Sequence, residues 1–143
     1  MASFPPVKTI EAHSTTAAPP SAVWALLADA STWSQWGAWS DVHVEGGGPQ
    51  QPGAIRVLVK RPYRLRERVT EWVPGERTGY ELLEGMPVRG YRSTVSLEEE
   101  PGGGTVVHWR STYDHAGPFT ALVLRLAVRD ACRRVARAAA SVA

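Results

Sequence analysis

The chain has 143 residues, of which 43% are hydrophobic and 21% are charged, and its formal net charge is +2. This composition is typical of a folded globular protein and excludes a disordered chain. No apolar run approaches the roughly 18 residues that a membrane span requires, and the opening MASFPPVKTIEAHS lacks the basic and apolar regions of a secretory signal. We therefore expect a single domain over residues 1–143.

Residue types that bind metals or carry redox chemistry are few and dispersed. Cys132 is the one cysteine, which excludes an internal disulfide and favours a reducing compartment, so we expect a cytoplasmic protein. The four histidines form no i, i+4 pair. The glycine-rich segments 46–48 and 102–104 lack the Lys-Ser/Thr of a phosphate-binding loop. The sequence therefore predicts neither a metal site nor a cofactor.

The N-terminal third predicts a strand followed by two short helices. Residues 7–16 have strand composition and end at an Ala-Ala-Pro-Pro stretch. Residues 19–29 place apolar side chains at helical spacing. Ser31 is suited to cap a second short helix over residues 32–38. Three tryptophans occur every third position in this region: Trp33, Trp36 and Trp39.

Beyond residue 48 the apolar period changes to two, which indicates strands. Short Pro/Gly connections between them predict an antiparallel meander. The predicted strands cover residues 53–60, 63–73, 77–85, 87–100 and 105–115.

A long amphipathic helix is predicted from Pro118 to the end of the chain, with Leu122, Leu126 and Val135 at helical spacing. Arginines 125, 129, 133 and 137 form an opposite stripe. The expected fold is therefore α+β. A curved antiparallel sheet of about six or seven strands would wrap around this helix and leave a cavity between the two.

The order of elements, and several segments along nearly the whole chain, resemble one known superfamily. The matching segments are APPSAVWALLADASTWSQWGAW (18–39), GAIRVL (53–58), residues 66–98 and GGGTVVHW (102–109). They are similar to the START-like, birch-pollen-allergen-like helix-grip (SRPBCC) superfamily, in its polyketide cyclase/dehydrase branch. The resemblance implies the helix-grip fold and an internal cavity, but the superfamily includes cyclases, lipid carriers and hormone receptors.

The resemblance also implies where the three tryptophans lie in the fold. In such proteins the first helical pair sits over one end of the cavity, so Trp33, Trp36 and Trp39 would be lid residues that contact the ligand. Alternatively, they fill the core as bulky aromatic side chains do in any small protein. Both interpretations remain open at this point.

Alternation along the strands predicts which polar side chains point into the cavity. Glu67 and Arg89 fall in phase with apolar neighbours, with Tyr91 beside them. The expected ligand-binding residues are Trp33, Trp36, Trp39, Val57, Tyr80, Ser93, Trp109 and Tyr113.

A buried charge requires a partner, so we expect a Glu67–Arg89 ion pair in which the pKa of Glu67 is lowered. One interpretation is a structural bridge that fixes strand register. The other is catalytic: Arg89 would hold an enolate oxygen while Glu67 or Tyr91 exchanges protons. That arrangement would suit cofactor-free aldol cyclisation and dehydration of a polyketide.

Three functions follow from these patterns. The first is binding of a small hydrophobic molecule, such as a polyketide, lipid or aromatic metabolite, and the second is a polyketide cyclase/dehydratase. The third is a lipid or quinone carrier that uses the arginine stripe at membrane surfaces. Although residues 60–68 are basic, no nucleic-acid-binding motif is present, so no nucleic-acid partner is expected. We expect a monomer or a homodimer.

Overall fold

The computed structural model describes residues 6–142. Its elements follow one another in this order: β1 (Lys8–Thr16), α1 (Pro20–Ala28), η1 (Ala30–Thr32), α2 (Trp33–Trp36), β2 (Asp41–Val44), β3 (Ile55–Lys60), β4 (Tyr63–Val73), β5 (Arg77–Glu84), β6 (Val88–Arg89), β7 (Arg92–Glu99), β8 (Thr105–Tyr113), β9 (His115–Ala116) and α3 (Pro118–Val142).

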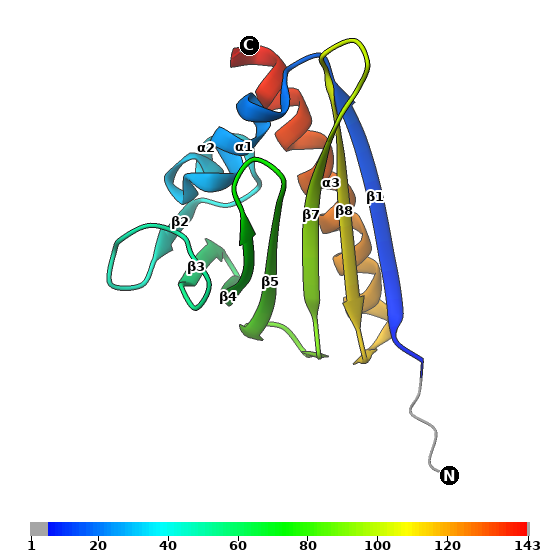
Figure 1. Cartoon of the computed structure of the whole chain (residues 1–143). Helices are drawn as coiled ribbons and strands as arrows, with labels where there is room; N and C mark the ends of the chain where they lie inside the picture. Colours follow the sequence, from blue (N-terminus) through cyan, green and yellow to red (C-terminus); the bar gives the residue numbers. More distant parts are fainter. Residues whose placement is uncertain (1–5, 143) are drawn as a thin grey trace.

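A seven-stranded antiparallel sheet, in the order β1-β8-β7-β5-β4-β3-β2, forms one layer. The long helix α3 lies along one face of this sheet and packs against β1 and β8 (Figure 1). The α1–α2 pair lies at one end of the molecule (Figure 1) and α1 contacts α3. This arrangement confirms the predicted helix-grip fold. None of the described helices is long and apolar enough to cross a bilayer.

Three local features differ from the sequence prediction. The four-residue strand β2 pairs with β3 and was not predicted, because four residues show too little alternation to identify. The second short helix is divided into η1 and α2. The predicted strand 87–100 is interrupted at Gly90, which has φ +70° and whose Cα lies against the Asp114 carboxylate. A side chain at Gly90 would meet that carboxylate, so only glycine suits this bend.

Of the three residues predicted on the apolar face of helix α3, Val135 is buried, whereas Leu122 and Leu126 are not. Leu122 and Leu126 are 52% and 55% exposed. The residues it buries include Leu124, Val128 and Val135, together with small ones such as Cys132. Apolar residues surround the first turns of the helix, so spacing alone could not identify the buried side. Small side chains on the chosen face allow a close approach to the sheet.

Candidate functional site

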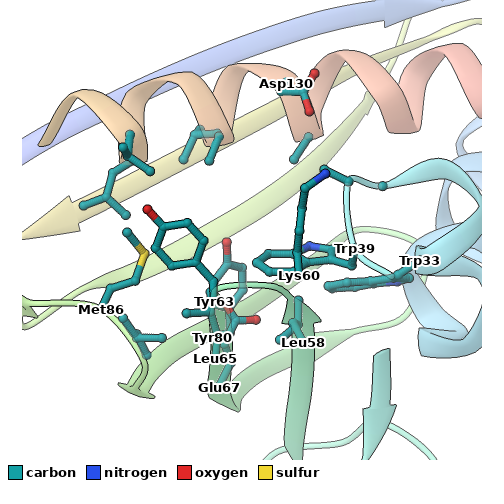
Figure 2. A pocket seen from close by; sticks show the side chains of 18 of the residues that line it. Trp33, Trp39, Leu58, Lys60, Tyr63, Leu65, Glu67, Tyr80, Met86 and Asp130 are labelled. Atoms are coloured by element: carbon teal, nitrogen blue, oxygen red, sulfur yellow. The ribbon is translucent and has the colours of Figure 1, made fainter. Parts of the chain in front are cut away.

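A cavity of about 230 Å³ lies between α3 and the β3–β5 part of the sheet, and it extends to the segment after α2 (Figure 2). Its walls are mainly aromatic and aliphatic. The aromatic lining residues are Trp33, Trp36, Trp39, Tyr63, Tyr80, Tyr91 and Trp109. Another depression, of about 460 Å³, lies between η1, β2 and the loop that follows β2. This depression lacks the aromatic lining of the 230 Å³ cavity. We therefore take the 230 Å³ cavity as the candidate site.

The β3–β4 hairpin builds one wall of this cavity as a ladder of three side-chain pairs. Lys60 lies opposite Tyr63 at the open end, Leu58 opposite Leu65 in the middle, and Arg56 opposite Glu67 at the base. Because alternate residues of a strand share a face, all three pairs point to the same side of the sheet. From the rim to the base, this wall therefore presents a basic side chain, then apolar side chains, and finally an ion pair.

The ion pair at the base is enclosed. Arg56 Nη2 donates to Glu67 Oε1 at 2.9 Å, and Arg56 Nη1 donates to Gln50 Oε1 at 2.8 Å. Arg56 is fully buried and Glu67 is 5% exposed. The guanidinium lies 4.4 Å from the ring centroid of Trp33 and 4.8 Å from that of Tyr80, within the range of cation–π attraction.

This geometry corrects the predicted Glu67–Arg89 pair. Arg89 is exposed on β6, because the bend at Gly90 interrupts the alternation on which the prediction relied. The sequence did contain a signal for the true partner. If two residues, Arg61 and Pro62, form the hairpin turn, residue 56 falls directly opposite residue 67.

The expected lowering of the Glu67 pKa is also wrong in direction. Burial raises the pKa of Glu67, and the nearby Arg56 charge and hydrogen bond oppose that rise without cancelling it. A carboxyl group in such surroundings is easier to protonate than one in water. Glu67 therefore has the character of a weak acid at the base of the cavity.

Neutral hydroxyl groups surround Glu67. Tyr80 OH accepts a hydrogen bond from Trp109 Nε1 at 3.3 Å, and Tyr91 OH donates to Ser111 Oγ at 3.1 Å. Burial is the main cause that raises the pKa of both tyrosines, so both hydroxyls stay protonated near neutral pH. The Ser111 hydroxyl also forms a hydrogen bond with Ser93.

The three tryptophans all line the cavity but are held differently. Trp33 Nε1 donates to the Leu26 carbonyl at 3.1 Å, and Trp36 Nε1 donates to Thr32 Oγ1 at 3.1 Å. Both are buried, with ring centroids 5.6 Å apart. Trp39 is half-buried and has no side-chain hydrogen bond within the described part of the chain. Trp33 and Trp36 therefore combine packing with cavity lining, whereas Trp39 lines the cavity with its side chain partly exposed, and its role as a lid stays a prediction.

The remaining predicted residues divide into two groups. Trp109 lines the cavity, whereas Ser93 and Tyr113 are buried but do not line it. Val57 does not line it, because its register with Arg66 places it on the opposite face of β3. Leu65 and Leu82, which are in phase with Glu67 and Tyr80, also line the cavity. Sequence reasoning missed another set of lining residues, namely Leu58, Lys60, Tyr63, Met86 and, on α3, Val123, Leu124, Ala127, Val128, Asp130 and Ala131.

Solved structures share this fold. A solution NMR structure of a protein from Thermobifida fusca has a TM-score of 0.74 at 26% identity, covering 93% of this chain and 90% of that one. A protein from Nitrosospira multiformis has a TM-score of 0.78 at 18% identity, covering 91% and 94%. The crystal structure of Ara h 8.0201 has a TM-score of 0.77 at 14% identity, covering 95% and 99%.

One curated relative matches over a shorter region. A protein named ribonuclease H, from Paracidovorax citrulli (strain AAC00-1), is 32% identical over 73 residues. That match covers 50% of this chain, and it spans only about half of the relative's length, 48%.

The family comparison covers nearly the whole chain. Residues 8–143 match the family described as polyketide cyclase / dehydrase and lipid transport. The matched region contains all the strands and helices that form the cavity. The chain is therefore a member of the polyketide cyclase/dehydrase and lipid transport family, within the SRPBCC superfamily.

Proposed function

We propose that this protein binds a small aromatic or polyketide-like molecule in the cavity beneath α3. The observation that carries the proposal is an apolar, aromatic-lined cavity whose hydrogen-bonding groups, Glu67, Tyr80 and Tyr91, gather at its base. Small-molecule sites typically combine apolar walls with a few convergent polar groups. A cavity of about 150 Å³ holds benzene, so 230 Å³ suits a molecule of about two fused rings.

The cyclase alternative is less well supported by this geometry. Glu67 and Tyr91 remain available as acid–base groups, but Arg89, which was to hold the enolate oxygen, is exposed. Arg56 does not replace it, because it lies behind Glu67 and is not among the residues that line the cavity. At the base of the cavity a cyclase would therefore have to stabilise an oxyanion with tyrosine hydroxyls, so binding is the function we favour.

Filling the cavity is expected to abolish binding without unfolding the protein. Ala131 lines the cavity from α3, and leucine there would occupy the space that the ligand needs. We expect Ala131→Leu to weaken binding of 2-naphthol at least tenfold, measured by calorimetry and by the change in tryptophan emission. Ala140→Leu, on an exposed turn of the same helix, is the matched control. Equal affinity in both variants would place 2-naphthol outside this cavity and refute the proposal.

A second candidate function, a carrier at anionic membranes, is favoured by an exposed apolar stripe on α3. Phe119, Leu122 and Leu126 are 74%, 52% and 55% exposed and lie on one side of the helix. Arg125 and Arg129 flank this stripe. Apolar residues flanked by arginines are typical of helices that lie in a membrane interface.

This candidate predicts salt-sensitive binding to lipid vesicles. We expect the protein to sediment with vesicles of phosphatidylglycerol and phosphatidylcholine, less so as salt rises and not with phosphatidylcholine alone. A Leu122→Ser, Leu126→Ser variant should lose this binding while keeping its affinity for 2-naphthol. Absence of vesicle binding by the unaltered protein would eliminate the carrier function and leave the binding proposal unaffected.

A further inference from the structure

We infer that the ligand is an elongated aromatic acid, whose carboxylate pairs with Lys60 at the rim while a hydroxyl at its other end donates to Glu67 at the base. This inference rests on the proposed binding function and specifies the ligand class for the same cavity. Its support comes from the two ends of the β3–β4 wall, at the Lys60–Tyr63 and Arg56–Glu67 pairs.

The rim of the cavity carries one cation. Among the described residues that line the cavity, Lys60 is the only basic one. Figure 2 shows its side chain beside Trp39, with Asp130 on the α3 side. Within residues 6–142 the Lys60 ammonium has no hydrogen bond or ion pair, whereas the outward-facing Arg66 and Arg68 are each paired with glutamate. Lys60 therefore offers an unoccupied positive charge where a ligand would enter.

The carboxylate of Asp130 does not take this charge. Asp130 lines the cavity from α3, but it accepts a hydrogen bond from Arg134 Nε at 2.7 Å, one turn further along the helix. The hydrocarbon stem of a lysine packs on apolar surface while its ammonium remains in water. An anion at the mouth would thus meet Lys60 without displacing an existing partner.

The base of the cavity presents a hydrogen-bond acceptor. Glu67 Oε1 is occupied by Arg56, while Oε2 has no hydrogen-bond partner among the described residues. Glu67 nonetheless lines the cavity, and its side chain is only 7% exposed. Within residues 6–142 the one fully enclosed side-chain atom without a partner is Arg56 Nε, so Glu67 Oε2 is open to the cavity. A ligand hydroxyl that reaches Glu67 would supply the missing donor.

The spacing between the two groups sets the shape of the ligand. Lys60 and Arg56 are four residues apart on β3, which is about 13 Å at the rise of an extended strand. The pair in between, Leu58 and Leu65, is apolar. A flat aromatic body with polar groups at opposite ends matches this order, and the flexible Lys60 stem accommodates differences in length.

The test compares three naphthalene probes by calorimetry: 6-hydroxy-2-naphthoate, 6-methoxy-2-naphthoate and 2-naphthol. We expect the unaltered protein to bind the hydroxynaphthoate at least tenfold more tightly than either other probe. Lys60→Met should remove the advantage of the carboxylate, so that the variant binds the hydroxynaphthoate no more than about twofold more tightly than 2-naphthol. Lys8→Met, at the far edge of the sheet, is the matched control and should change nothing.

The base is tested with an Arg56→Met, Glu67→Leu double variant, which should bind the hydroxy and methoxy probes equally. The inference is overturned if the carboxylate adds no affinity, or if Lys60→Met leaves its advantage intact. In either case, binding of 2-naphthol would show that the proposed function still stands. If none of the three probes binds, the proposed function itself fails for ligands of this size.

Discussion

Replacing Arg56 with methionine is expected to lower the free energy of unfolding by roughly 3–5 kcal/mol at neutral pH, the range for breaking a buried ion pair. The reason is that Glu67, only 5% exposed, would lose its counter-charge while remaining out of water. The stacking of the guanidinium between Trp33 and Tyr80 would also be lost. Denaturant unfolding followed by circular dichroism measures the change.

The decrease in the free energy of unfolding caused by Arg56→Met should depend on pH. Burial already raises the pKa of Glu67 above its ordinary value of 4.5, and Arg56 supplies both effects that oppose the rise. Without Arg56, the pKa in the folded state rises further. A carboxyl whose folded pKa exceeds its unfolded pKa contributes stability while protonated, and loses it as pH rises through the folded pKa. The deficit relative to the unaltered protein should therefore be smallest in acid and should grow toward neutral pH.

Two further variants test whether the loss of stability in Arg56→Met comes from breaking the buried Arg56–Glu67 pair. Arg56→Met combined with Glu67→Leu removes both charges and should recover much of the lost stability, because apolar side chains often replace a buried ion pair well. Arg68→Met removes an exposed arginine that pairs with Glu81, and should change stability by less than about 1 kcal/mol. A loss in Arg56→Met no greater than in Arg68→Met would show that the pair at the base is not enclosed.

Trp33→Ala is expected to destabilise the fold by roughly 3–5 kcal/mol, as truncation of a buried tryptophan does. Trp33 is 5% exposed, packs against Trp36 and covers the Arg56 guanidinium. Its indole also donates to the Leu26 carbonyl at the end of α1. Thermal and denaturant unfolding would measure this loss.

Trp39→Ala provides the contrast. Trp39 is half-buried and lines the cavity, so its removal should change stability by less than about 1.5 kcal/mol. The affinity for 2-naphthol should nevertheless fall about tenfold, which corresponds to about 1.4 kcal/mol. Equal losses of stability in the two variants would contradict the division into a packing residue and a lid residue. Unchanged ligand affinity in Trp39→Ala would assign all three tryptophans to packing.

Most of the fold could be predicted from local sequence patterns. The strand β4 was predicted with its observed ends, Tyr63 and Val73, because alternation over residues 63–69 leaves little ambiguity, although its pairing with β5 shifts register between Val69 and Glu71. The start of α3 at Pro118 follows from a Gly-Pro pair ahead of a long helical pattern. Elements with many residues of one period are determined locally, so their existence and order were recoverable.

Part of the candidate site could be predicted in the same way. Glu67, Tyr80 and Trp109 are in phase with apolar residues of their own strands, and each lines the cavity as expected. Tyr91 also lines it, from the position between Gly90 and the start of β7. The tryptophans of the α2 region were identified by their concentration in one segment, and all three border the same cavity.

Pairing between elements was decided only by the tertiary structure. Alternation specifies which residues of a strand share a face, but not which face meets the cavity, so Val57 was wrongly expected to line it and the face of Leu58 and Lys60 was not identified. The bend at Gly90 reversed the expected orientation of Arg89. The partner of Glu67 and the position of Lys60 at the rim depend on the register of two strands and on the placement of α3 above them. The Arg56–Glu67 pairing follows from a short hairpin once the face of β3 that meets the cavity is known, whereas the placement of α3 is a long-range contact that no local period encodes.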